Sequence, residues 1–61
     1  MTKIKRILML RDKMTPNEAE ELISQARGQL EEYLFLGDIE SAENICSEYF
    51  GLEPDYIEEL Y

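Results

Sequence analysis

The 61-residue sequence has no histidine, no tryptophan and only one cysteine. A single cysteine cannot form an intramolecular disulfide, and Cys46 alone does not supply the several N, S or O ligands of a structural zinc site. We therefore expect neither a disulfide nor a metal to stabilise the chain. A lone unpaired thiol also fits a reducing compartment, so we expect a cytoplasmic protein.

Long apolar segments are absent as well. The longest uninterrupted apolar run is Ile7–Leu10, whereas a helix that spans a bilayer needs about 20 such residues. Basic residues precede this run, as in a signal peptide, but the run is shorter than the roughly 7–15 residues of a signal h-region. Charged residues follow it directly. We expect neither a membrane span nor a cleaved signal.

Basic residues are few and unevenly distributed. The formal net charge is -8, with 6 basic and 14 acidic residues. Residues 1–13 hold five of the bases and one acid, a charge of +4, whereas residues 14–61 hold Arg27 against thirteen acids, a charge of -12. So negative a body repels phosphate, which makes direct nucleic-acid binding unexpected. The basic segment is either a short helix or an arm. We expect its charge to be solvated or to meet the acidic body, and the alternative is an arm that contacts nucleic acid weakly.

No pattern in the sequence predicts catalysis. The acids occur mainly in neighbouring pairs such as Glu20-Glu21 and Glu58-Glu59 on predicted solvent faces, whereas a general acid or base needs a pocket that shifts its pKa. Cys46 has no histidine to activate it. The glycines are scattered, and the acids lack the D-x-D-x-D pattern of a calcium loop. We expect no enzyme, and no catalytic, cofactor-binding or metal-binding residue.

Apolar spacing predicts helices. Ile4, Ile7 and Leu8 favour a short helix over residues 3–12 rather than a strand. Thr15-Pro16-Asn17-Glu18 is typical of a capping box, with threonine at the N-cap and proline at the first helical position. The helix that follows should end at Gly37. Its predicted buried stripe is Ala19, Leu22, Ile23, Ala26, Leu30, Tyr33 and Leu34.

Asp38 is a good N-cap for a second helix, and so short a connection predicts an antiparallel hairpin. Gly51 should end this helix in a Schellman-type stop, before a short third helix with Pro54 in its first position. The predicted buried residues are Ile39, Ala42, Ile45, Cys46, Tyr49 and Phe50, then Leu52, Ile57, Leu60 and Tyr61. We expect an all-α protein of three to four helices, with a basic segment (1–13) and an acidic helical domain (14–61).

The segment C-S-E-Y-F-G-L-E-P-D-Y, together with E-A-E-E-L-I and G-D-I-E-S-A-E-N-I, resembles short acidic proteins encoded in conjugative transposons and prophages of Gram-positive bacteria. This resemblance covers residues 14–60 and implies a mobile-element context without a mechanism. Y-L-F-L-G-D-I-E-S-A followed by L-E-P also resembles one tetratricopeptide-type helical hairpin. Such repeats need neighbouring repeats to bury their faces, and the sequence contains only one repeat of this kind.

These observations favour a non-catalytic protein–protein interaction module that binds through an apolar helical face rimmed by acids. The partner is another protein or a second copy in a homodimer, without a small-molecule substrate, cofactor or membrane. Large aromatic residues often anchor partners. The candidate partner-binding residues are Tyr33, Tyr49, Phe50, Tyr56 and Tyr61. The alternative is an acidic inhibitor that mimics nucleic acid at a basic site on a host enzyme.

Overall fold

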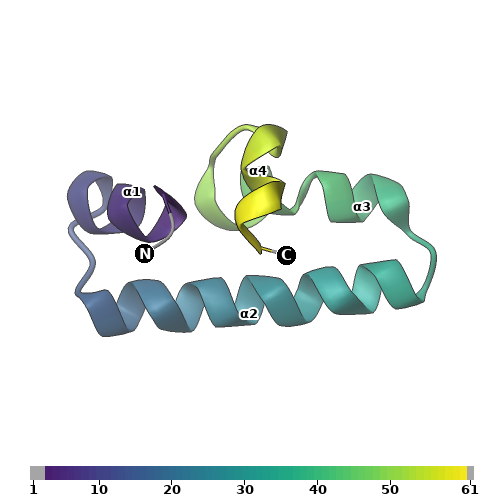
Figure 1. Ribbon diagram of the computed structural model, residues 1–61, viewed down its shortest axis with the longest axis horizontal. Helices are drawn as coiled ribbons and strands as arrows, with labels where there is room; N and C mark the ends of the chain where they lie inside the picture. Colours follow the sequence, from purple (N-terminus) through teal and green to yellow (C-terminus); the bar gives the residue numbers. More distant parts are fainter. Residues whose placement is uncertain (1–2, 61) are drawn as a thin grey trace.

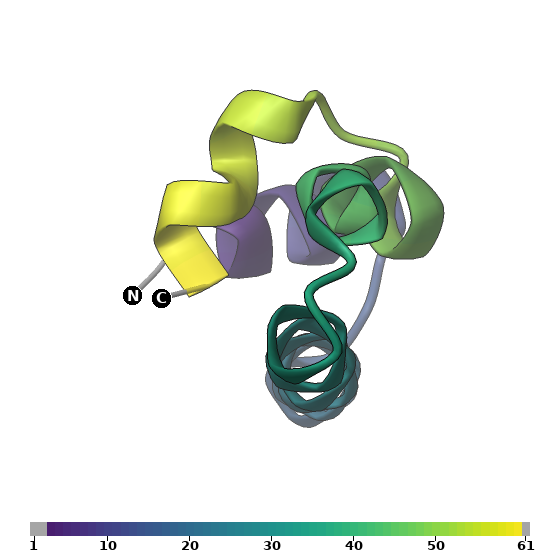
Figure 2. The same ribbon diagram turned by 90° about the vertical axis from the view of Figure 1, so that its right-hand side faces the viewer.

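The computed structural model describes residues 3–60, and every regular element in this part of the chain is a helix. Helix α2 runs along the whole length of the molecule, and the other helices lie along one side of it (Figures 1 and 2). The prediction of a small all-α protein built on a helical hairpin is confirmed. The elements are α1 (Lys3–Arg11), α2 (Pro16–Phe35), α3 (Ile39–Glu43), α4 (Ile45–Phe50) and the 3-10 helix η1 (Pro54–Leu60).

Local hydrogen bonds set both ends of α2. The Thr15 hydroxyl accepts from the Glu18 amide at 3.2 Å, and the Glu18 carboxylate accepts from the Thr15 amide at 2.9 Å. This confirms the predicted capping box. At the other end, Gly37 has a φ of 76°, and the amides of Gly37 and Asp38 donate to carbonyls of the last turn at 3.2 and 2.8 Å. That pair of bonds is a Schellman motif, which glycine permits because it tolerates positive φ.

The second arm of the hairpin was predicted as one helix, but the structure interrupts it at Asn44. Asp38 caps α3 as expected, because its carboxylate accepts from the Ser41 amide at 3.2 Å. The side-chain amide of Asn44 donates to the Glu40 carbonyl at 3.0 Å. Asparagine competes in this way with the backbone bonds of a helix, which gives a local reason for the break. Both α3 and α4 contact α2.

Helix α4 ends at Gly51, which has the predicted left-handed conformation with a φ of 64°. The Gly51 amide donates to the Ser47 carbonyl and the Leu52 amide donates to the Cys46 carbonyl, both at 3.1 Å. The residue after the glycine thus bonds back to the helix, as in the predicted Schellman-type stop, but with a spacing of six residues where the standard motif has five. The predicted third helix is present as η1, and it is a 3-10 helix. Its first turn contains the hydrogen bond typical of a 3-10 helix, in which an amide donates to the carbonyl three residues earlier: the Tyr56 amide donates to the Glu53 carbonyl at 3.2 Å.

The basic N-terminal segment forms a packed helix rather than an extended arm. Ile4 and Leu8 of α1 are fully buried, and α1 contacts both α2 and η1. Helices α1 and η1 therefore cover part of the apolar stripe of α2. The buried core consists of Ile4, Leu8, Ala19, Ile23, Ala26, Leu30, Ala42, Ile45, Cys46, Phe50 and Leu60.

Part of the positive charge of this segment is used within the chain. The Lys5 ammonium pairs with the Glu20 carboxylate of α2. The Arg11 guanidinium forms two hydrogen bonds to the Asp12 carboxylate, at 3.0 and 2.8 Å, and also donates to the Phe50 carbonyl at the end of α4. A cation at a helix C-terminus is favourable because the carbonyls there carry partial negative charge. These contacts tie α1 to α2 and α4.

Candidate interaction surfaces

A group of large apolar side chains remains exposed where α2 turns into α3, at the end of the molecule opposite α1 (Figure 1). We call this group the hairpin tip. Phe35 is the most exposed of its members, at 90%, and Leu36 follows at 67%. The tip consists of Leu34, Phe35, Leu36 and Ile39.

Two residues of the hairpin tip were predicted to be buried, and those predictions are wrong. Leu34 is 40% exposed and Ile39 is 53% exposed. The helix α3 beside them has only five residues and contributes only Ala42 to the core. The helices α1, α4 and η1 lie over the remainder of α2 (Figure 1). Periodicity placed Leu34 and Ile39 on the correct helical stripes, but no described element covers the end of those stripes.

Carboxylates surround the hairpin tip on both sides along the chain. Glu31 and Glu32 lie in the turn of α2 before it, and Asp38 and Glu40 lie at the start of α3. All four residues are exposed. The sequence has no basic residue after Arg27, so no positive charge of the second half neutralises them. The tip is therefore an apolar surface with an acidic rim.

The aromatic residues predicted to bind a partner lie elsewhere. Tyr33, Tyr49 and Tyr56 are partly buried and pack against the core. Phe50 is only 2% exposed, so its contacts are within the chain, and its ring lies 6.3 Å from that of Tyr49 at an angle of 54°. Tyr61 lies outside the described residues. The structure thus does not bring these residues together as one exposed surface.

Tyr33 is the predicted residue closest in sequence to the hairpin tip. Partial burial and the negative charge of Glu48 on α4 raise the pKa of its hydroxyl. The group therefore stays protonated at neutral pH and can donate a hydrogen bond. Tyr33 packs against the core and directly precedes the hairpin tip in the sequence.

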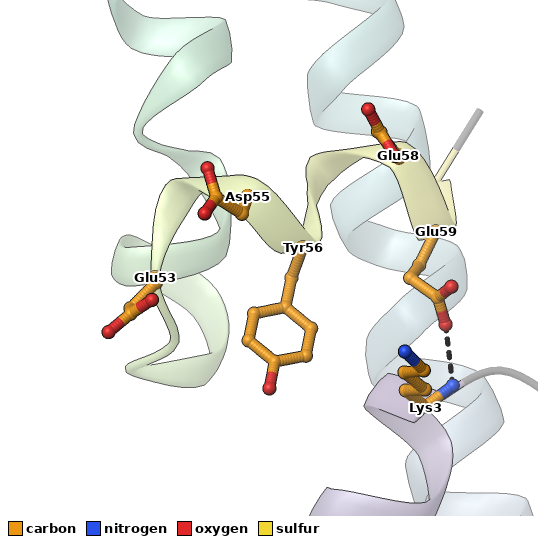
Figure 3. A pocket seen from close by; sticks show the side chains of 6 residues that line it. All are labelled: Lys3, Glu53, Asp55, Tyr56, Glu58 and Glu59. Atoms are coloured by element: carbon orange, nitrogen blue, oxygen red, sulfur yellow. Dashed lines mark hydrogen bonds between the residues drawn. The ribbon is translucent and has the colours of Figure 1, made fainter.

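A second candidate surface is an acidic hollow of about 290 Å³ beside η1 (Figure 3). Its lining residues are Lys3, Glu53, Asp55, Tyr56, Glu58 and Glu59. The Glu59 carboxylate is turned toward α1, where it accepts a hydrogen bond of 2.5 Å from the backbone amide of Lys3 (Figure 3). A carboxylate at a helix N-terminus is favourable because the free amides there carry partial positive charge. One acid of the hollow therefore holds α1 in place.

The remaining carboxylates of this hollow do not converge. Glu58 points to the opposite side of η1 from Glu59, and Glu53 and Asp55 point outward from the start of η1 (Figure 3). Within residues 3–60 no group of three or more such side chains has the arrangement to hold a metal ion. A neighbouring hollow of about 460 Å³ shares Asp55 and Glu58 and adds Glu43. Helix η1 thus displays separate negative charges rather than a chelating site.

Cys46 lies in the core, where it is fully buried. Burial raises the pKa of its thiol, which disfavours the reactive thiolate. Its place on α4 matches the predicted apolar stripe.

None of the helices in the described part of the chain has the length and apolar character needed to cross a membrane.

The chain matches no family model, no curated protein and no solved structure in the comparisons made. Sequence reasoning missed Phe35 and Leu36, although a signal was present. Leu34-Phe35-Leu36 is a run of consecutive apolar residues at a helix end, and a helix with one buried stripe cannot turn all of them inward.

Proposed function

We propose that this chain is a non-catalytic protein–protein interaction module, which binds its partner through the hairpin tip. The observation that carries the proposal is the exposure of Phe35 and Leu36, at 90% and 67%, within a rim of carboxylates. The resemblance to short acidic proteins of conjugative transposons and prophages suggests that the module serves a mobile element, and its single thiol fits the cytoplasm.

Burial of the hairpin tip supplies the driving force for binding. Full burial of a phenylalanine or leucine side chain contributes about 1.5–3 kcal/mol, and aromatic residues at the centre of an interface are frequent anchors. The acidic rim selects a partner whose apolar surface is bordered by basic groups, because like charges across an interface cost free energy. The partner is therefore a protein with an apolar contact surface between basic residues.

The test compares three tagged proteins as bait for bacterial lysate: the wild type, Phe35→Ser and a control, Gln25→Ser. Both variants change exposed residues of α2, and serine has a helix propensity similar to that of phenylalanine. A partner that binds the wild type and the Gln25→Ser variant but not the Phe35→Ser variant supports the proposal. Equal capture by all three proteins contradicts it. Circular dichroism should show the same helix content throughout.

A second candidate function is an acidic inhibitor that occupies a nucleic-acid site on a host enzyme. The observation that favours it is the charge of residues 28–61, which hold ten acids and no base. Several of these acids line the two hollows beside η1, and all of them except Glu59 are exposed. Carboxylates presented in this way would take the positions of phosphates in a basic groove.

Salt and charge variants separate the two candidate functions. The inhibitor predicts a basic enzyme as partner, released by moderate salt because the Debye length is about 10 Å at 0.1 M. It also predicts loss of binding when Asp55 and Glu58 become Asn and Gln, with little effect of Phe35→Ser. The interaction module predicts the reverse pattern of variants and a partner that moderate salt does not release.

A further inference from the structure

We infer that the hairpin tip of one copy binds the outer face of α1 of a second copy, so that the chains associate head to tail. This inference rests on the proposed role of the tip and names its partner. The α1 outer face is formed by Arg6, Leu10 and Lys13, all of which are exposed.

Along the chain, the apolar centre of the α1 outer face lies between two bases. Leu10 is 75% exposed, although it lies on a helix whose Ile4 and Leu8 are fully buried. Arg6 precedes Leu10 by one helical turn, about 6 Å along the axis at about 1.5 Å per residue. Lys13 follows it just beyond the end of α1.

The two bases of this face are available for contacts with another molecule. Arg11 is held by Asp12 within its own chain, and its guanidinium also reaches the end of α4. By contrast, neither Arg6 nor Lys13 takes part in a salt bridge within residues 3–60. The positive charge on the outer side of α1 is therefore not neutralised by the body of the protein.

The hairpin tip has the complementary arrangement. Its apolar centre lies between acids, with Glu31 and Glu32 before it and Asp38 and Glu40 after it. Contact between the tip and the α1 outer face would bury Leu10 against Phe35 and its neighbours while opposite charges meet on both sides. Such complementarity fixes the orientation of partners and suppresses wrong pairings. Tip-to-tip contact would bring two acidic rims together, and contact between two α1 faces would bring bases together.

The two surfaces of one chain cannot meet. They lie at opposite ends of a molecule 33 Å long (Figure 1). Contact is therefore between copies, and each copy offers one surface of each kind. Such a heterologous interface extends into a chain of molecules, or closes into a ring when the rotation permits. Because both surfaces are small, we expect a transient association with a Kd between about 1 μM and 1 mM.

Two variants test this arrangement. Phe35→Ser removes the centre of the tip and leaves α1 intact, and Arg6→Glu with Leu10→Ser removes the α1 outer face and leaves the tip intact. In sedimentation velocity, the mass of the wild type should rise with concentration from the 7.2 kDa monomer beyond the dimer. Each variant alone should remain monomeric. An equimolar mixture should form a 1:1 dimer that does not grow, because only one productive contact remains.

NMR titration locates the contact even when it is weak. In labelled Phe35→Ser protein, the unlabelled Arg6→Glu/Leu10→Ser variant should shift amide signals of α1, and the reverse titration should shift signals around Gly37. A wild type that stays monomeric at about 1 mM, the upper end of the expected Kd range, would overturn the inference. So would a mixture without a dimer, or dimerisation of the α1 variant alone. If the wild type is monomeric while Phe35→Ser still loses a captured protein, the proposed function stands without this inference.

Discussion

Replacement of Leu8 by alanine tests the packing of α1 against the rest of the protein. Leu8 is fully buried where α1 lies on the body of the protein. A buried Leu→Ala change costs about 2–5 kcal/mol, because apolar contacts are lost and a cavity remains. The whole domain should have only about 3–9 kcal/mol of stability, at roughly 0.05–0.15 kcal/mol for each of its residues. One side chain of the basic segment therefore accounts for a large part of the stability.

Urea unfolding of dilute protein, followed by circular dichroism, measures the effect. With an m-value near 1 kcal/mol per molar urea, Leu8→Ala should lower the midpoint by at least about 2 M or leave the chain unfolded. Ile4→Val provides a milder probe of the same contact, because it should cost about 0.5–1.5 kcal/mol. It keeps the measurement informative when Leu8→Ala does not fold.

Leu10→Ala is the matched control. It makes the same chemical change in the same helix, so the change in helix propensity is equal, but Leu10 is 75% exposed. We expect its free energy of unfolding to stay within about 0.5 kcal/mol of the wild type. Equal effects of the two alanine variants, or a neutral Leu8→Ala, would refute the packing of α1 and favour an extended arm.

Three further predictions concern local features. Gly37→Ala should destabilise the protein by about 1–2 kcal/mol, because the φ of 76° at this position strains any residue other than glycine. Gly28→Ala should stabilise the protein by about 0.5–1 kcal/mol, because the added methyl group meets nothing within 4 Å. Thermal unfolding of the two variants and the wild type measures both effects. Hydrogen bonds from Thr15 lower the pKa of Glu18 in the folded protein. The charged carboxylate therefore stabilises the fold at any pH above the pKa that Glu18 has in the unfolded chain, and this stabilisation is lost as the pH falls through its pKa in the folded protein. The difference in urea midpoint between wild type and Glu18→Gln should shrink from about pH 7 to about pH 3, and an unchanged difference would contradict this. Cys46 should react slowly with a thiol reagent in the native state and rapidly in denaturant, and equal rates would show that it is not buried.

The candidate surface was only partly predictable. An apolar surface with an acidic rim was expected, but aromatic side chains such as Tyr49 and Phe50 were chosen as its anchors, and these pack within the chain. The hairpin tip around Phe35 was missed because helical periodicity was used only to assign one buried stripe, and the run of three consecutive apolar residues at the helix end was not weighed beside it. Which of them is exposed depends on how far along α2 the other helices extend.

The sequence by itself determined where α2 begins and ends. The Thr15–Glu18 capping box and the left-handed Gly37 act through hydrogen bonds between residues close in the chain, so their effects can be read from the local sequence. Only the tertiary structure decided which apolar residues are covered. Ile23 and Ile39 both lie on predicted apolar stripes, but Ile23 is buried while Ile39 is not. Burial depends on whether a distant segment lies against a given face, and local periodicity does not contain that information.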